Sequence, residues 1–340
     1  AYDEPIKYFS ENIEFRRNTD FTIANLTGVE TIELSLPAKS GTIADPAYLA
    51  DIDDLAEYMR NQPGVTHVAT LSDTMKRLNR SMNGDRPGTY RLPDSQELAA
   101  QYLLLYELSL PQGLDLGNTV DLDKSASRMV VTFGITNSAQ TIETAERARQ
   151  WLQSNAGATI EPAAISSPAV MFAHISSANI TGMVNGTGIT FGLITLAIIL
   201  AMMSLKYGLL SVISNVLPSI MAFGIWALVV AKIDIAVAVA ATCTIGIVVD
   251  FTVHFLAKFH LMRPGRSVTE ALTRALDLVG PPILSTAMIL ACGFSVLALS
   301  DFRLNWVLGT LSAAMIVLGV VLVFIAVPAA LVRLQRTSPN

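Results

Sequence analysis

One acidic side chain lies deep inside an apolar run of the sequence. Asp250 is the single charged residue between Ile235 and Ala257, and His254 follows it four residues later. On a helix this spacing places both side chains on one face, where a carboxylate and an imidazole can share or pass a proton. A charge at membrane depth is costly, so it is retained where it has a task or a partner. The pattern therefore predicts a proton relay formed by Asp250 and His254.

Two plainer roles stay open for this pair. The carboxylate of Asp250 could be a hydrogen-bonding group that only fixes helix packing, and His254 could lie close to the water layer at the cytoplasmic surface. Three further polar residues are the predicted neighbours of the relay. They are Thr252 on the same helix, and Ser285 and Thr286 near the start of the next apolar run.

Small and helix-breaking residues mark where helices pack or bend. Gly246 lies one turn before the acid, and its lack of a side chain would let a neighbouring helix approach closely. Pro218, with Asn215 nearby, indicates either a kink with a freed carbonyl group or a tolerated packing feature. Gly182 and Gly186, at the entry to the first apolar run, indicate either flexible coupling or close packing.

Stretches without charge predict where the chain crosses a membrane. A helix needs about 20 apolar residues to cross a bilayer. Four long stretches contain no Asp, Glu, Lys or Arg, and a fifth contains only Asp250. The predicted spans are about 185–205, 208–231, 235–257, 281–299 and 305–332. Five such runs in one chain argue against buried core helices of a soluble protein.

The composition is typical of a membrane protein with one polar domain. Of the 340 residues, 51% are hydrophobic and 15% are charged, and the mean hydropathy is +0.47, whereas about a quarter of a soluble domain is charged. Residues 1–180 carry 14 Lys and Arg against 23 Asp and Glu, while residues 181–340 carry 9 against 5. No basic patch suits a nucleic acid, and Cys243 and Cys292 lie in apolar stretches. The sequence therefore predicts no nucleic-acid partner, disulfide framework, metal site or cofactor.

Basic residues in the short loops predict the orientation in the membrane. On one side, Lys206, the loop 258–274 and the C-terminal end give seven positive charges, and on the other side Lys232 and Arg303 give two. Because the side richer in Lys and Arg faces the cytoplasm, residues 1–180 are expected outside it. In a bacterium this describes a multi-pass protein of the inner (cytoplasmic) membrane with its first domain in the periplasm.

A short amphipathic helix is predicted at about 267–279, on the cytoplasmic face. Ser267 and Glu270 form a capping box at its start, and apolar residues follow at helical spacing. Pro281 and Pro282 come directly after it, where they suit the first turn of the fourth span.

The first 180 residues alternate predicted strands and helices. Strands are expected at about 31–36, 65–71, 128–136 and 158–165, and helices at about 45–62 and 142–154. A further capping box, Asp94 with Glu97, opens a helical stretch between the two β-α-β units. Two such units fit a ferredoxin-like α/β sandwich. The predicted fold class is an α+β membrane protein, with a periplasmic domain 1–180 followed by a five-helix transmembrane bundle 181–340.

The sequence around the acid resembles the signature of a transporter family. Residues 246–256 read G-I-V-V-D-F-T-V-H-F-L, similar to the motif G-I-x-V-D-[YF]-x-x-H-F-L of resistance-nodulation-division (RND) exporters. The stretches 270–286 and 293–299 resemble that family as well, so the likeness covers about residues 240–332. The branch that the chain resembles most is the predicted lipid and hydrophobe exporters, or MMPL group.

This resemblance implies an architecture and a relay. In the family, each half has one helix, an outer porter domain of ferredoxin-like parts and five more helices. The chain looks like one half, the C-terminal one, without its first helix. The resemblance implies proton-driven transport, with Asp250 in the relay and a partner acid in the other half. Family members often carry Tyr where this sequence has Phe251, so the implied relay lacks one hydroxyl.

The implied function is the export of hydrophobic or amphiphilic, lipid-like molecules. Protonation of Asp250 would shift helix packing and so move the outer domain. Implied partners are a membrane lipid or hydrophobic small molecule as substrate, the other half of the transporter, periplasmic accessory proteins and further copies in an oligomer. The alternative is a sterol-sensing-like lipid sensor or assembly protein that does not pump. A membrane enzyme, the third interpretation, has little support, because no catalytic constellation appears in the sequence.

Overall fold

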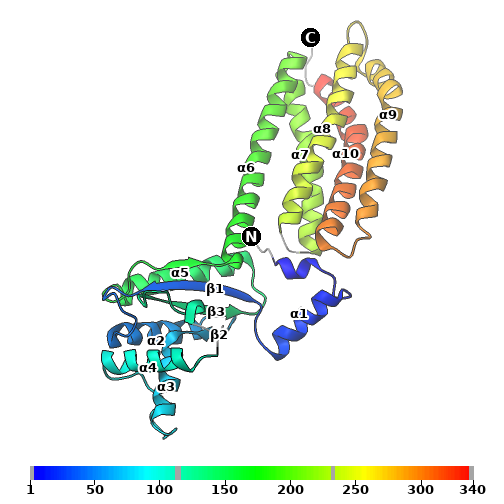
Figure 1. The fold of residues 1–340 in the computed structure, drawn as a ribbon. Helices are drawn as coiled ribbons and strands as arrows, with labels where there is room; N and C mark the ends of the chain where they lie inside the picture. The colour runs from blue at the N-terminus through cyan, green and yellow to red at the C-terminus, as the bar shows by residue number, and fades with distance from the viewer. Residues whose placement is uncertain (1–3, 112–115, 231–233, 337–340) are drawn as a thin grey trace. The chain divides into compact units, whose positions relative to one another are not determined.

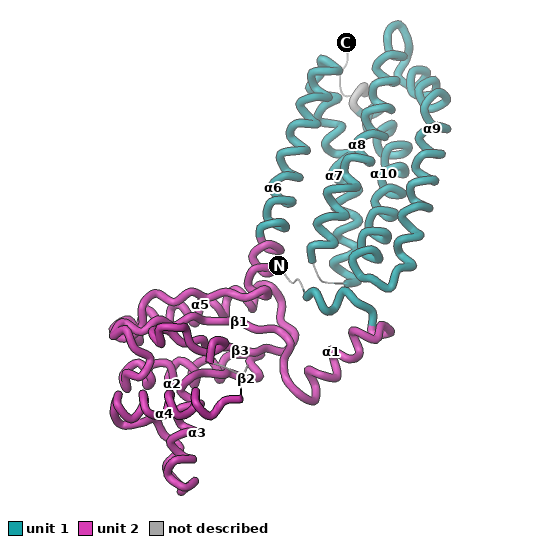
Figure 2. Tube along the Cα trace, viewed as in Figure 1, with its two compact units in different colours: residues 1–10, 178–340 teal, residues 11–177 magenta. Residues whose placement is uncertain are grey.

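The chain folds into two compact units. The computed structural model describes three stretches of it, 4–111, 116–230 and 234–336 (Figure 1). The helical unit contains Ala1–Ser10 and Ala178–Asn340, and the α/β unit contains Glu11–Ser177 (Figure 2). Residues 1–3, 112–115, 231–233 and 337–340 lie outside the described residues. One of them is Lys232, which contributes to the predicted orientation.

The first described residues pack in the helical unit, although the sequence assigns them to the first domain. A short 3-10 helix, η1, covers Pro5–Tyr8. The rings of Tyr8 and Phe9 lie 6.0 Å and 5.4 Å from the ring of Phe302, centroid to centroid. The N–H of Ser10 also donates to the carbonyl of Asp301, the residue before Phe302, at 3.2 Å. These aromatic contacts explain why the segment belongs to the helical unit.

A four-stranded antiparallel sheet lies at the centre of the α/β unit. Its strands are β1 (Glu30–Pro37), β2 (Val65–Ala69), β3 (Ala126–Phe133) and β4 (Ala164–Ser166). They lie side by side in the order β2-β3-β1-β4, and Leu34 of β1 is opposite Met129 of β3. Apolar residues of β1 and β3 alternate into the core, as expected for strands with one buried face.

Helices cover the buried face of this sheet. The α-helices that lie wholly within the described part of the unit are α1 (Glu14–Asn25), α2 (Pro46–Arg60), α3 (Leu71–Met82), α4 (Gln96–Ser109) and α5 (Ser138–Asn155), and a short 3-10 helix, η2, covers Leu116–Asn118. α2 begins as predicted, because the side chain of Asp45 accepts a hydrogen bond from the N–H of Ala47. Apolar residues of α2 and α5 share one buried cluster with those of β1 and β3. The hydroxyl of Tyr48 donates to the carbonyl of Leu36 at 2.6 Å, which ties α2 to the sheet.

Two local predictions for this unit are wrong. Ser95, not Asp94, caps α4, because the side chain of Ser95 accepts the N–H of Leu98 while Asp94 pairs with a nearby arginine. The strand predicted at 158–165 is reduced to β4. Pro162 has no N–H to donate to a strand ladder, which explains the late start of β4.

Five long helices make up most of the helical unit. They are α6 (Pro168–Met202), α7 (Leu205–Val229), α8 (Ile235–Met262), α9 (Val268–Leu297) and α10 (Arg303–Arg336). Each is long and apolar enough to cross a membrane. Within the described residues, each of the five predicted spans therefore corresponds to a long apolar helix. α6 starts well before the predicted 185 and carries the chain from the α/β unit into the helical unit without a break.

The predicted amphipathic helix 267–279 is not a separate element. Ser267 caps it as predicted, since its side chain accepts the N–H of Glu270 at 3.2 Å. The helix then continues through Pro281 and Pro282 to the end of α9. These prolines therefore lie inside a helix and not in its first turn. Helices inside a membrane tolerate proline, because packing against neighbouring helices compensates for the lost hydrogen bonds.

Close helix packing centres on α10, which contacts α7, α8 and α9. A Cβ atom at Gly309 would lie 2.5 Å from the carbonyl oxygen of Phe294, so α9 and α10 approach backbone to backbone. A Cβ atom at Gly319 would lie 3.0 Å from the side chain of Val248 on α8. The sequence predicts such an approach at Gly246. A Cβ atom added there would have no described atom within 4 Å, so the described helices do not approach closely at this glycine.

Candidate functional site

The predicted relay pair lies in contact on α8. The Nε2 atom of His254 is 3.3 Å from the Oδ1 atom of Asp250. Each of the two side chains is 62% exposed within the described chain. The structure places both side chains on an outer face of α8. The reason is that α7, α9 and α10 pack against the other sides of this helix.

The exposed face of α8 differs in chemistry from the other exposed helix faces. Its exposed residues from 242 to 257 are small or polar: Thr242, Cys243, Gly246, Asp250, His254 and Ala257. We call them the polar face of α8. The exposed side chains of α6 and α7 include large aliphatic ones: Val184, Ile189, Leu193, Ile213, Ile220 and Ile225. Lipid-facing helix surfaces are apolar, whereas small and polar residues are typical of surfaces that meet another helix.

The three predicted relay neighbours do not join the pair. Thr252 is fully buried on the inner side of α8. The hydroxyl of Ser285 donates to the carbonyl of Pro282 on its own helix, at 3.0 Å, and Thr286 is exposed. Among the described residues, no hydrogen bond connects any of these three side chains to Asp250. The structure thus brings together only the acid and the histidine of the predicted set.

The remaining predicted packing residues lie on α6 and α7. Ideal Cβ atoms at Gly182 and Gly186 would meet no described atom within 4 Å, so close packing at these glycines is not seen. Pro218 lies inside α7, which continues through it as one helix. The side chains of Pro218 and of Asn215, three residues earlier, are both buried. The proline is therefore accommodated without ending the helix.

Sequence reasoning missed the polar groups in the interior of the helical unit. A hydrogen bond joins the hydroxyl groups of Thr244 on α8 and Ser312 on α10, whose oxygen atoms are 2.7 Å apart. Oxygen atoms of Asn215, Ser219 and Thr252 are buried there as well. Single Ser, Thr and Asn residues in apolar runs carry no spacing signal that shows which of them face the interior.

The helical unit also has two apolar hollows. One, of about 310 Å³, lies between α6, α7 and α8, with Phe191, Phe223 and Trp226 among its lining side chains. The other, of about 730 Å³, lies between α9 and α10, with Met288 and Val321 in its lining. Apolar hollows of this kind suit acyl chains. Within the described residues, no group of three or more His, Cys, Asp or Glu side chains could hold a metal ion.

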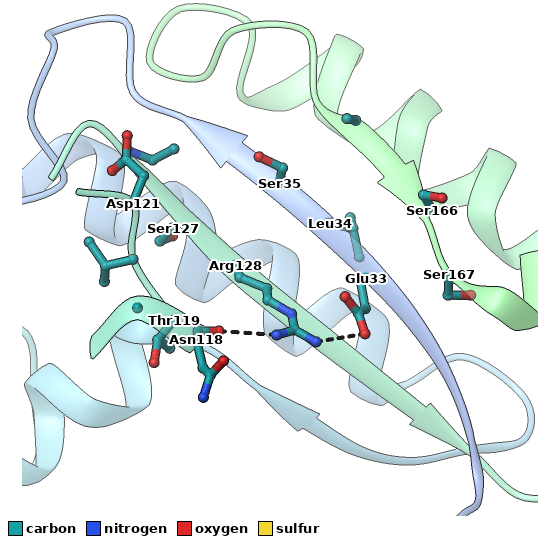
Figure 3. A pocket seen from close by; sticks show the side chains of 14 residues that line it. Glu33, Leu34, Ser35, Asn118, Thr119, Asp121, Ser127, Arg128, Ser166 and Ser167 are labelled. Carbon is teal, nitrogen blue, oxygen red and sulfur yellow. Dashed lines mark hydrogen bonds and ion pairs between the residues drawn. The ribbon is translucent and has the colours of Figure 1, made fainter. Parts of the chain in front are cut away.

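A polar hollow of about 410 Å³ lies on the open face of the sheet in the α/β unit. Figure 3 shows Arg128 of β3 reaching between Glu33 and Asn118. Its guanidinium is 2.6 Å from the carboxylate of Glu33 and donates to the carbonyl of Asn118 at 3.2 Å. Because Glu33 neutralises this arginine, the hollow offers no net positive charge to an anionic head group.

Three titratable groups in the described part of the α/β unit have shifted pKa values. Hydrogen bonds from its own backbone N–H and from the side chain of Ser95 lower the pKa of Glu97. Burial raises the pKa of Tyr48 to about 12, and its hydrogen bond with Ser127 only partly offsets this. Burial by itself would also raise the pKa of Asp121, at the edge of the polar hollow. Hydrogen bonds from the Ser125 hydroxyl and from the N–H groups of Ser125 and Ala126 outweigh burial and lower it. The hydrogen bonds of Tyr48 and Asp121 therefore help to hold α2 and the loop 121–126 against the sheet.

A model described as the MMPL family matches residues 25–339. The matched range includes almost all of the α/β unit and the five long helices. No curated protein matches the chain.

Proposed function

Because the chain belongs to the MMPL family, we propose that it exports hydrophobic or amphiphilic, lipid-like molecules, driven by proton entry. The family consists of multi-pass membrane transporters of the RND type, not of enzymes. In our proposal the helical unit crosses the bacterial inner membrane and the α/β unit is a periplasmic porter-type domain. The excess of Lys and Arg in alternate loops supports this orientation. The strand order β2-β3-β1-β4, with α2 and α5 on one face, supports a ferredoxin-like sandwich.

The carboxylate–imidazole pair at membrane depth carries this proposal. Asp250 lies in the middle of α8, and His254 is one turn closer to the end that we place in the cytoplasm. A proton taken up from the periplasm neutralises the carboxylate, and the imidazole passes it towards the cytoplasm. Proton entry down a membrane potential supplies about 2.3 kcal/mol per charge for each 100 mV. One or two protons per cycle are enough to bias a two-state equilibrium.

The polar face of α8 supports a protein partner at the relay. Facing lipid, this pair would be costly, and the small residues beside it would leave lipid poorly packed. We therefore place a helix of the transporter's other half against this face. Neutralisation of Asp250 then changes the electrostatics of a helix–helix contact, which is a direct way to shift packing.

α6 supports a mechanical connection between the relay and the α/β unit. It is one continuous helix of 35 residues that begins in the α/β unit and ends in the helical unit. In our proposal, helix movement around α8 reaches the α/β unit through α6. The porter-type domain then opens and closes a path for the substrate.

Asp250→Asn in the native transporter tests the relay. Purified protein would be placed in vesicles with an imposed proton gradient, and transfer of a phospholipid with a fluorescent acyl chain would be measured. We expect transfer by Asp250→Asn to fall to the level of empty vesicles, and Asp250→Glu to keep part of it. Asp277→Asn, an exposed acid of α9, is the matched control and should transfer normally. Undiminished proton-dependent transfer by Asp250→Asn would refute the relay.

A lipid sensor without pumping is the second candidate, and the two apolar hollows of the helical unit favour it. Such a protein changes conformation when lipid binds, whether or not a proton gradient is present. The same vesicles distinguish the two functions. Lipid-dependent change in tryptophan fluorescence without gradient-dependent transfer would support the sensor.

A further inference from the structure

Three polar side chains in the interior of the helical unit have an oxygen without a hydrogen-bond partner among the described residues. They are Asn215 and Ser219 on α7 and Thr252 on α8, which are 2%, 6% and 0% exposed. At membrane depth no bulk water is available, and an unpaired polar group costs several kcal/mol. Three such groups in one interior therefore indicate a bound polar species.

Packing places Asn215 and Thr252 at the same level. Ala222 of α7 and Ile245 of α8 belong to one buried cluster. α7 and α8 are consecutive helices that run in opposite directions (Figure 1). Asn215 precedes Ala222 by seven residues and Thr252 follows Ile245 by seven. Seven residues are about two turns, or about 10 Å, so the geometry places both residues at about the same depth, and both side chains are buried.

The other buried hydroxyl groups of this interior already have partners. Ser211 and Ser214 donate to carbonyl oxygens of α7, at 2.7 Å and 2.9 Å. The hydroxyl of Thr244 donates to the carbonyl of Ala240 at 2.7 Å and is also bonded to the hydroxyl of Ser312. A serine or threonine in a helix usually bonds back to its own backbone in this way. The hydroxyl groups of Ser219 and Thr252 do not, so they are left to bind something else.

Pro218 adds a fourth oxygen to this site. Proline has no N–H, so the carbonyl of Ser214, four residues earlier, loses its helical partner. Ser214 and Asn215 are adjacent, and Ser219 is one turn from both. The site thus offers two acceptors, the carbonyl of Ser214 and the amide oxygen of Asn215, and two hydroxyl donors.

We propose that this site binds an ordered water molecule between α7 and α8. Water donates two hydrogen bonds and accepts two, and the site supplies two acceptors and two donors. A monovalent cation fits less well, because it would leave the hydrogen atoms of the Ser219 and Thr252 hydroxyl groups without acceptors. No carboxylate compensates a cation there either, since Asp250 faces outward from α8.

The bound water has a consequence for α8. Thr252 is two residues after Asp250 and on the inner side of the same helix. Water bonded to both α7 and Thr252 therefore fixes α8 to α7 at the depth of the acid. This role does not depend on proton transfer by Asp250.

A double-mutant cycle tests the proposal on the purified transporter in detergent. Asn215→Leu and Thr252→Val remove the oxygen atoms at nearly constant volume. Each single variant should lower the unfolding midpoint by about 2–8 °C, because it leaves the bound water short of a partner. The double variant should lose clearly less than the two losses added together. Strictly additive losses would overturn the proposal.

Two further measurements keep the test decisive if a variant does not fold. The first is a pair of control cycles. Thr244→Val with Ser312→Ala removes a directly bonded pair and shows how large the coupling of two bonded side chains is, whereas Thr195→Val with Thr252→Val combines two unconnected side chains and should be additive. The second is a high-resolution map of the unmodified protein, in which we expect one density peak within hydrogen-bonding distance of Asn215 and Thr252. A direct bond between these two side chains would overturn the proposal, as would a midpoint that rises with sodium but not with choline.

Discussion

Gly246→Leu tests whether protein covers the polar face of α8. Gly246 lies one turn before Asp250 on that face, and a Cβ atom there would meet no described atom within 4 Å. Within the described chain the larger side chain therefore has room. Leucine is also a better helix former than glycine, by roughly 0.8 kcal/mol. The substitution should leave the unfolding midpoint of the helical unit unchanged or slightly higher.

The expected effect on transport is much larger. A helix packed against the polar face would approach closely at Gly246, and a leucine there overfills the contact. Overpacking typically costs about 1–3 kcal/mol, which corresponds to about a 5- to 150-fold change in the population of an arrangement. We therefore expect transfer of the fluorescent phospholipid to fall by about tenfold or more, with normal amounts of folded protein.

Gly224→Leu provides the matched control for this experiment. Gly224 of α7 is also free of described atoms within 4 Å of its ideal Cβ position, but its exposed neighbours Ile220 and Ile225 are large aliphatic residues. Facing lipid, a leucine at this position should have no effect on transfer. Normal transfer by Gly246→Leu would show that lipid covers α8, and the reasoning from its small and polar residues would be wrong.

Three other predictions concern stability. Gly309→Ala should lower the unfolding midpoint of the helical unit by several degrees, because its Cβ atom would lie 2.5 Å from a backbone oxygen of α9, whereas Gly246→Ala should not. Tyr48→Phe should destabilise the α/β unit by about 1–3 kcal/mol in urea unfolding. The unmodified unit should lose stability as the pH rises from 10 to about 12, since the pKa of Tyr48 is raised from 10.0 to about 12 in the folded state, and the variant should lack this loss. Asp121→Asn should be less stable than the parent at pH 7, and the difference should shrink as the pH falls below 3.8, because folding lowers the pKa of Asp121 from that value.

Local patterns in the sequence were sufficient for most elements of this protein, although they missed α1 and misplaced the starts of β4 and α9. Uncharged stretches located the five long helices, because the length needed to cross a bilayer is a local property. The spacing of Asp250 and His254 was enough to predict their contact on one helical face, which the structure gives as 3.3 Å. Strand alternation and the Asp45 cap likewise depend only on neighbouring residues.

The tertiary structure alone decided which faces of those elements meet. Apart from the polar face of α8 and the amphipathic start of α9, the long helices of the helical unit are apolar around most of their circumference, so their sequences do not tell inner faces from outer ones. Only packing showed that Asp250 faces outward, that Thr252 is buried on the opposite side of α8, and that Gly309 rather than Gly246 permits a close approach. Local spacing follows from the geometry of one helix, whereas the neighbours of a face depend on long-range contacts with helices far away in the sequence.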